Sequence, residues 1–337
     1  MDELLVTVDA RFDEIIKMIE RSRAKIFWNV NAELIDLYWN IGKSLSALAK
    51  DSSFGDRAIP EVASFIAKTN PSYKGFTRPC LYRMKQFFET YEGDEEALKL
   101  IKDISWSNHL LIMAKAKTIE ERHFYLSHCV KDHYSKRELE RQIDSAYYER
   151  YVLSSKRALP ASTPKGISES ILDTYVLDFL DLPSNFDEKS LRKAIIENLK
   201  KFILEFGKDF TFVGEEYRLH VGLEDYSIDL LFFNRSLSCL VPIELKTGRF
   251  RPEYIGQINF YMEALDRDVK KANENPSVGL VLCASKDDMV VEYALSRSIS
   301  PTLVSEYTFA LPDKKLLKSK MREIADLAYE NAKKNED

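Results

Sequence analysis

The chain is poor in glycine, and it lacks the short motifs of several common enzyme classes. Only 11 of its 337 residues are glycine. The glycine-rich loop of P-loop NTPases, the Rossmann fingerprint of dehydrogenases and the serine motif of the α/β-hydrolases do not occur in it. These absences argue against those three classes. Any chemistry must therefore be sought in individual polar residues.

Long apolar runs, clustered cysteines and an excess of basic charge are also missing. The four cysteines are scattered, and no apolar run reaches the length of a membrane span. Without a signal-peptide pattern, this predicts a reduced, cytoplasmic protein with no membrane partner. The net charge of −5 argues against indiscriminate nucleic-acid binding but leaves room for a local basic groove. With 45% hydrophobic residues, the chain can build two cores.

Two short apolar segments carry charged residues inside otherwise hydrophobic sequence. Residues 226–233 contain Asp229, and residues 239–246 contain Glu244 and Lys246. Both segments are apolar on both faces and rich in β-favouring residues, which predicts buried strands. An ionised carboxylate in such surroundings is costly unless it is paired or bound to a metal. These three charges therefore need an explanation.

A hairpin would bring the three charges together. Residues 234–238 are short and polar enough to join the strands as an antiparallel pair, with Asp229 beside Glu244. Side chains alternate along a strand, so Glu244 and Lys246 point to the same side. Neighbouring carboxylates suit Mg²⁺ or Mn²⁺, and a lysine beside them could orient water and balance phosphate charge. A buried ion-pair network that only fixes the strand register is the alternative.

A predicted helix follows the second strand directly. Residues 251–265 show an apolar stripe and a proline in the first turn. Gln257 and Tyr261 are four residues apart and share a helix face, from which they could reach the site or a phosphate. An ordinary amphipathic helix with a half-buried tyrosine would explain the same spacing.

Further elements predict a complete sheet. Residues 210–221 follow a predicted helix that ends at Gly207, and they read as another strand. Glu215 and Glu216 point to opposite sides of it, so one of them can face the same cleft as Asp229. Downstream, the sequence predicts a strand at 277–283, a helix at 287–296, a strand at 303–309 and a charged C-terminal helix. This order is typical of a mixed sheet flanked by helices.

The stretch from about Asp173 to Leu311 combines these elements in a specific sequence. It reads AIIENLKKFILEFGKDFTFVGEEYRL, then YSIDLLFFNRSLSCLVPIELKTGRFRPEYIGQINFYMEALD, then NPSVGLVLCASKDDMVVEYAL. This sequence resembles the catalytic domain of the YhcG-type nucleases, a branch of the PD-(D/E)xK phosphodiesterase superfamily. The resemblance implies that Asp229 and Glu244 are metal ligands and that Lys246 is the catalytic lysine. It also implies an accessory QxxxY element, which corresponds to Gln257 and Tyr261.

Two positions depart from the family pattern. Ile228 precedes Asp229 where the superfamily name has proline, and Glu216 stands where the family usually has glutamine. We predict Glu216 as a further metal ligand, although an acidic residue there could instead weaken phosphate approach. In the superfamily a glutamate on the first helix often supports the metal. Glu197 and Glu205 are the candidates, and spacing does not choose between them.

The N-terminal half resembles the usual partner domain of the same family. Helical periodicity begins at about Asp9 and again covers residues 30–42, and a shorter helix follows at about 60–68. After a glycine-containing turn, Thr77 is placed to N-cap a helix that runs to about Tyr91. The sequence therefore predicts an all-α region.

The last of these helices has a basic side and an apolar side. Arg78, Arg83 and Lys85 lie beside four apolar residues, which are Leu81, Met84, Phe87 and Phe88. A helix, a turn and a helix with a basic front form the layout of a helix-turn-helix, so we predict that the three basic residues bind DNA. A helical bundle whose basic residues only solvate one face is the alternative.

Together these observations predict an α+β protein of two domains. Residues 1–153 form a helical, DNA-recognising domain, 154–168 a linker, and 169–337 a restriction-endonuclease-like domain with a mixed sheet. The predicted activity is Mg²⁺- or Mn²⁺-dependent hydrolysis of DNA by an endonuclease, and a homodimer would allow both strands to be cut. One alternative is a non-catalytic DNA-binding scaffold that retains the nuclease fold. The other is a nuclease specific for RNA or branched DNA.

Overall fold

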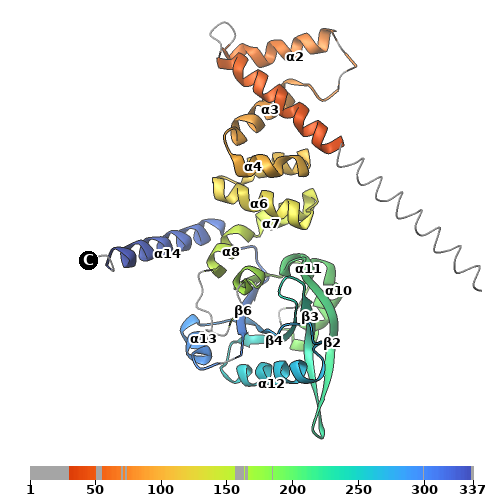
Figure 1. Ribbon diagram of the computed structural model, residues 1–337, viewed down its shortest axis with the longest axis vertical. Helices are drawn as coiled ribbons and strands as arrows, with labels where there is room; N and C mark the ends of the chain where they lie inside the picture. The colour runs from red at the N-terminus through yellow and green to blue at the C-terminus, as the bar shows by residue number, and fades with distance from the viewer. Residues whose placement is uncertain are drawn as a thin grey trace, which may run out of the picture. The chain divides into compact units, whose positions relative to one another are not determined.

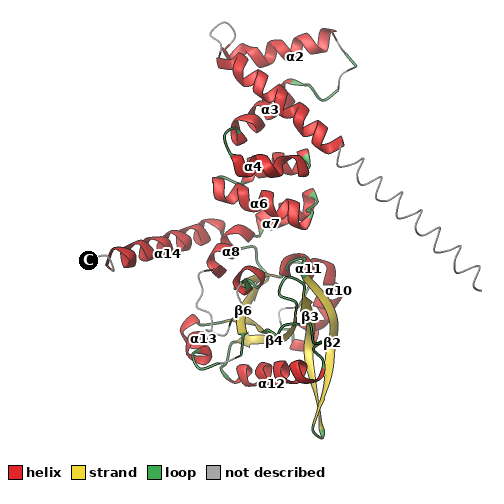
Figure 2. Cartoon of the chain, viewed as in Figure 1, coloured by secondary structure: helices red, strands yellow, loops and turns green. Residues whose placement is uncertain are grey.

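The chain folds into a helical unit followed by a unit of helices and strands. The computed structural model describes residues 30–50, 55–69, 71–72, 74–155, 163, 166–183, 185–298 and 300–334. Two compact units, Met1–Glu140 and Arg141–Asp337, are described separately below. All strands among the described residues lie in the second unit (Figure 2). The helix expected from about Asp9 and most of the expected linker lie outside the described residues.

The first unit is built from short helices that follow a longer helix at residues 30–50. The later elements are η1 Gly55–Arg57, α2 Ala58–Thr69, α3 Arg78–Tyr91, α4 Glu95–Leu100, η2 Ile101–Asp103, α5 Trp106–Lys115, α6 Ile119–Asp132 and the first part of α7 Lys136–Asp144. Gly42 lets the first helix approach α3 closely, because a Cβ at this position would lie 2.2 Å from the Met84 carbonyl oxygen. The helical character predicted for this half is confirmed.

The third helix, α3, begins where the sequence predicts. Thr77 is its N-cap residue, although the Thr77 hydroxyl donates to the Cys80 sulfur at 3.3 Å and accepts no backbone N–H. The four apolar residues expected on its inner side are all buried. The connection from α2 to α3 covers residues 70–77, whereas a helix-turn-helix usually has a turn of about 3–4 residues.

The second unit contains a six-stranded mixed sheet of order β1-β6-β5-β4-β3-β2. Strands β2, β3 and β4 pair antiparallel, whereas β4, β5, β6 and β1 pair parallel. The elements are α8 Tyr147–Ser155, α9 Ile167–Ser170, β1 Thr174–Val176, α10 Glu188–Glu197, α11 Leu199–Phe206, β2 Phe210–Val221, β3 Glu224–Asn234, β4 Cys239–Arg249, α12 Glu253–Asp268, β5 Gly279–Ser285, α13 Asp288–Leu295, β6 Thr302–Thr308 and α14 Lys314–Lys334. The predicted mixed sheet flanked by helices is confirmed.

Helices cover both faces of this sheet (Figure 1). On one face, Phe206 of α11 stacks with Phe232 of β3, and the ring of Phe202 lies tilted against the same residue. On the other face, Ile258 of α12 belongs to the same buried cluster as Leu231, the neighbouring residue of β3. Gly279 permits α12 to lie close to β5, because a Cβ there would come within 2.7 Å of Ile258. The helix after the Glu-x-Lys strand is thereby held against the sheet.

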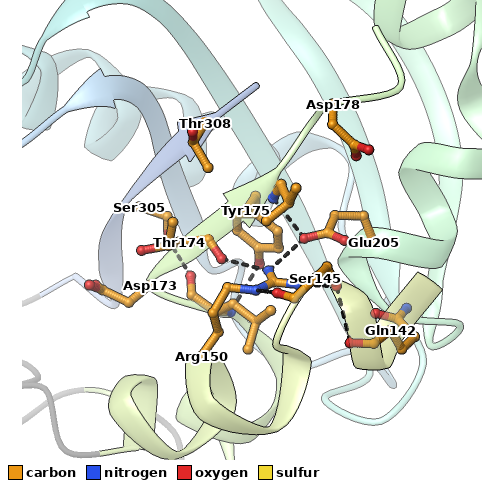
Figure 3. Close-up of polar contacts among 12 residues, drawn as sticks. Gln142, Ser145, Arg150, Asp173, Thr174, Tyr175, Asp178, Glu205, Ser305 and Thr308 are labelled. Atoms are coloured by element: carbon orange, nitrogen blue, oxygen red, sulfur yellow. Dashed lines mark hydrogen bonds and ion pairs between the residues drawn. The ribbon is translucent and has the colours of Figure 1, made fainter. Parts of the chain in front are cut away.

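The segment after Arg141 packs against the sheet of the second unit. Arg150 of α8 is buried and donates to Glu205 at 2.6 Å and to the Thr174 carbonyl oxygen at 2.9 Å (Figure 3). Glu205 also accepts from the backbone N–H of Val176 at 2.7 Å. The division into compact units falls between Glu140 and Arg141, and the domain boundary after residue 153 stays a prediction.

Two details of this unit are absent from the sequence-based expectations. Strand β1 has only three residues, which is too short for a periodic signal. The helical stretch before Gly207 breaks at Asn198 into α10 and α11. Among the described helices, none combines the length and the apolar character needed to cross a membrane.

Candidate active site

The register of the β3–β4 hairpin brings the two acidic residues face to face. Leu230 of β3 pairs with Ile243 of β4 at the end of the ladder, so the next positions along are Asp229 and Glu244. The predicted hairpin is thus present, and its register places the two acidic residues next to each other on neighbouring strands.

Glu244 is a buried carboxylate with incomplete hydrogen bonding. Its side chain is buried, with 4% of the residue exposed, and its Oε1 accepts from Lys246 Nζ at 2.8 Å. Its Oε2 is buried and has no hydrogen-bond partner among the described residues. Burial, and then the charge of Asp229, raise the pKa of Glu244 to about 7, although Lys246 opposes the shift. Ionisation of Glu244 therefore costs more free energy here than it would in water.

Lys246 is held beside this carboxylate by several contacts. Its Nζ lies 3.5 Å from Glu188 Oε2 of α10 and 5.0 Å from the centroid of the Tyr254 ring. Burial acts to lower the pKa of Lys246, but the hydrogen bond to Glu244 and its charge outweigh burial, so the pKa is raised. The lysine is therefore a protonated ammonium next to the acidic pair.

Both oxygens of Asp229 accept hydrogen bonds. Oδ2 accepts from the backbone N–H of Leu245 and Oδ1 from Arg192 Nη1, each at 2.9 Å. The second terminal nitrogen of Arg192 donates to Glu216 at 2.6 Å. A cationic side chain of α10 thus neutralises this carboxylate.

The acidic pair provides the donor set that a divalent cation requires. Asp229 and Glu244 offer hard oxygen ligands from neighbouring strands, and the orphaned Oε2 of Glu244 is an atom that a cation would satisfy. In the described part of the chain, no three acidic, histidine or cysteine side chains converge as a preformed metal site. Arg192 and Lys246 instead provide the positive charge. The pair fits Mg²⁺ or Mn²⁺ as two protein ligands.

Comparison with known proteins identifies the family. The YhcG PDDEXK nuclease domain matches residues 168–322, and the DUF1016 N-terminal domain matches residues 14–150. "Putative nuclease YhcG" of Escherichia coli (strain K12) is 30% identical over 345 aligned residues, which cover 90% of this chain and 91% of the relative. The chain belongs to the YhcG nuclease family. The resemblance noted in the sequence is confirmed, and the family is one of PDDEXK nucleases.

One solved structure aligns with part of this chain. The crystal structure of a repair endonuclease from Pyrococcus abyssi aligns with 39% of this chain and 50% of its own chain, at 15% identity and a TM-score of 0.26.

Glu216, predicted as a metal ligand of this YhcG-family site, contacts Arg192 in the structure. Its side chain is 63% exposed, and its carboxylate pairs with the terminal nitrogen of Arg192 that does not contact Asp229. Glu215 is also exposed. The role of Glu216 as a further metal ligand stays a prediction.

The two candidates for the first-helix glutamate of the family lie away from the site. Glu197 is exposed and lies 3.9 Å from Lys193 on the next turn of α10. Glu205 is fully buried in the network with Arg150. The glutamate that does reach the site is Glu188, near Lys246, which the sequence analysis missed.

A local signal for Glu188 exists in the sequence. Asp187 accepts from the backbone N–H of Ser190 at 2.8 Å and so N-caps α10. An aspartate directly before a segment with helical apolar periodicity is a helix-start signal, and it places Glu188 in the first turn. Arg192 lies four residues later on the same face. The cap thus marks the helix that contributes both missed side chains.

The predicted QxxxY pair lies on one face of α12. Gln257 Nε2 donates to the hydroxyl of Tyr261 at 2.9 Å. Burial raises the pKa of Tyr261, and the charges of Glu244 and Asp229 act in the same direction. The Tyr261 ring is therefore close enough to the acidic pair to respond to its charge.

The three predicted DNA-binding residues differ in their surroundings on α3. Arg78 and Arg83 are exposed, and the Arg78 guanidinium lies 5.7 Å from the centroid of the Tyr82 ring. Lys85 is only partly exposed and pairs with Glu89 at 2.9 Å on the next turn. The two arginines are thus more accessible than the lysine.

Proposed function

We propose that this PDDEXK nuclease is a metal-dependent endonuclease that hydrolyses phosphodiester bonds of DNA. The observation that carries the proposal is the pairing of Asp229 with the buried Glu244, one oxygen of which is left without a partner among the described residues beside Lys246. A folded core would normally complete the bonds of such a group. The incomplete bonding is consistent with a cation ligand.

Each residue of the site takes a defined task in this mechanism. Asp229 and Glu244 hold the cation, which when bound would polarise the phosphoryl oxygen and favour deprotonation of water. Lys246 orients the attacking water and balances the negative charge that develops on the phosphate. Glu188 and Tyr254 keep the ammonium of Lys246 in position. Because Glu216 contacts Arg192, we build the metal site from Asp229 and Glu244 alone.

The QxxxY pair is assigned to substrate positioning. The amide of Gln257 and the hydroxyl of Tyr261 are joined by a hydrogen bond and share one side of α12. Tyr261 lies near the acidic pair, because the charges of Asp229 and Glu244 both act to raise the pKa of its hydroxyl. We therefore assign Gln257 and Tyr261 the task of orienting a substrate phosphate next to Asp229 and Glu244.

The helical unit is assigned to DNA binding through α3. Arg78 and Arg83 are the leading candidates for phosphate contacts, because they are exposed on the side opposite the buried apolar residues. Lys85 would first have to leave Glu89. The helix-turn-helix arrangement, the homodimer and the cytoplasmic location stay predictions.

A cleavage panel tests the proposed function. The intact protein is incubated with linear duplex, branched and single-stranded DNA and with RNA, in MgCl₂ or MnCl₂. We expect DNA cleavage that Asp229→Asn and Lys246→Ala each reduce by at least about 10²-fold. Arg267→Gln, at an exposed position of α12, is the matched control and should cut like the wild type.

The same panel separates the alternatives. A folded wild-type protein that cuts no substrate with either metal would favour the non-catalytic DNA-binding scaffold. Cleavage confined to RNA or to branched DNA would instead reassign the substrate and keep the chemistry. Circular dichroism of each variant shows whether a loss of cutting reflects the site or the fold.

A further inference from the structure

Arg192 contacts both the partly buried carboxylate of Asp229 and the exposed carboxylate of Glu216. One terminal nitrogen donates to Asp229 at 2.9 Å and the other donates to Glu216 at 2.6 Å. The Arg192 side chain is 12% exposed, whereas that of Glu216 is 63% exposed. The guanidinium therefore turns one edge to the catalytic carboxylates and the other edge to a group that solvent reaches.

The backbone of Glu216 adopts a conformation that is unusual for its residue type. Its φ angle is 44°, in the left-handed region that residues other than glycine seldom occupy. Neighbouring pairs Glu215–Leu230 and Tyr217–Ile228 stay in register, so Glu216 stands opposite Asp229. Such local strain persists where surrounding contacts impose it, and it is frequent at functional sites. The contact observed here is the ion pair with Arg192.

Building on the proposed function, we propose that Arg192 binds a phosphate of the substrate backbone and that Glu216 occupies Arg192 until nucleic acid displaces it. The planar guanidinium fork matches a phosphate as well as it matches a carboxylate. A phosphate on the Glu216 edge of Arg192 lies next to Asp229 and so beside the metal ligands. Glu216 is therefore an internal competitor of the substrate.

Exposure makes this exchange feasible for Glu216. An ion pair with a solvent-exposed partner contributes little stability, and water can solvate the released carboxylate. The Arg150–Glu205 pair of the same unit shows the opposite situation, because its side chains are 2% and 0% exposed. Release of Glu205 would leave a buried charge uncompensated. The two arginine–glutamate pairs are thus suited to different tasks.

Binding of a fluorescent DNA duplex to the full-length protein in EDTA tests the proposal without cleavage. Anisotropy should show that Glu216→Gln binds about three- to fivefold more tightly than the wild type, because the competitor loses its charge. Arg192→Gln should bind about tenfold more weakly, because a charge-assisted contact is lost. The double variant should be as weak as Arg192→Gln alone, and Glu216→Asp should match the wild type.

A matched pair on α12 controls for nonspecific electrostatics. Glu263 and Arg267 form an exposed ion pair in the same unit, and Glu263 is 61% exposed. Glu263→Gln and Arg267→Gln make the same changes in charge, and neither should alter the affinity by more than about twofold. Arg192→Lys keeps the charge without the planar fork, so it replaces Arg192→Gln if the latter does not fold, and should still weaken binding.

Three results would overturn the inference. The first is an unchanged DNA affinity in Glu216→Gln. The second is the same gain in affinity from Glu216→Gln when Arg192 is also replaced. The third is an equal gain in affinity from Glu263→Gln. A supporting kinetic result is a KM for cleavage that falls about threefold in Glu216→Gln while kcat stays constant. Failure of the wild type to cleave in Mg²⁺ or Mn²⁺ would reject the proposed function separately, because the anisotropy measurements involve no hydrolysis.

Discussion

The regions around Glu205 and Glu244 both bury a carboxylate in the sheet unit, but they complete its bonding differently. Glu205 accepts from Arg150 (Figure 3) and from the Val176 N–H, and its second oxygen lies 3.5 Å from Arg141 Nη2. Glu244 has Lys246 on one oxygen, whereas the other has no partner among the described residues. Both oxygens of Glu205 are thus contacted by donors within the fold. The incomplete set at Glu244 is what a reactive site requires.

Loss of the Glu205 charge should have the largest effect on folding. Glu205→Gln leaves the buried guanidinium of Arg150 without its counterion, which should lower the unfolding free energy by about 3–5 kcal/mol. Native-state hydrogen exchange at amides of β3 and β4 reports on this unit specifically. The exposed variant Glu263→Gln should change exchange little. A loss below about 1 kcal/mol for Glu205→Gln would mean that the two regions do not differ in this way.

A methyl group at Gly279 should affect the Glu244 region through α12. A Cβ there would press on Ile258 and Met262, so Gly279→Ala should cost about 1–3 kcal/mol by overpacking. We expect Gln257 and Tyr261 to shift with α12 and cleavage to fall with stability, as thermal unfolding and activity assays would show. Gly248 lies in open space, so Gly248→Ala is the matched control. Equal behaviour of both variants would contradict the close packing of α12.

Neutralisation of Glu244 should stabilise the metal-free protein at high pH. Because burial raises the folded-state pKa of Glu244 from 4.5 to about 7, stability from this group is complete below about pH 4.5 and is lost as pH rises through 7. Glu244→Gln should therefore gain about 1–2 kcal/mol at pH 8 in EDTA and nothing at pH 4.5. Urea titrations at both pH values check this. If Glu244→Gln instead lost stability at pH 8, the Glu244 carboxylate would stabilise the fold as that of Glu205 does.

Strand pairing around the site could be predicted from the sequence. Buried strands leave a strong local signal in apolar β-favouring residues, and the short polar connection at 234–238 favours a hairpin. Once the hairpin forms, its register brings Asp229 and Glu244 together. The apolar stripe of residues 251–265 likewise predicted the helix that carries Gln257 and Tyr261. All of these features depend on residues close together in the chain.

Contacts made by long side chains between distant elements could not be predicted. Strand alternation assigns Glu216 a side, but a register shift after Phe212 and the left-handed backbone at Glu216 depend on tertiary structure. The cap at Asp187 marks the start of α10, yet nothing local indicates that Glu188 and Arg192 reach β3 and β4. Likewise, no local pattern distinguishes Glu205 in its ion pair from a metal-supporting glutamate.

Removal of the Tyr261 hydroxyl should have the smallest effect on folding. Tyr261→Phe loses one hydrogen bond from Gln257, which contributes about 0.5–1.5 kcal/mol. We expect a change at the lower end of this range, because Gln257 is exposed and can bond to water. Cleavage should fall more steeply than stability if the pair orients a phosphate. Parallel losses of the two would reduce Tyr261 to a packing role.

Anomalous diffraction from a crystal soaked in MnCl₂ tests the metal assignment most directly. We expect one peak between the carboxylates of Asp229 and Glu244, with Arg192 moved away from Asp229 Oδ1. A crystal that shows no manganese at this pair, or shows it beside Glu205, would contradict the account.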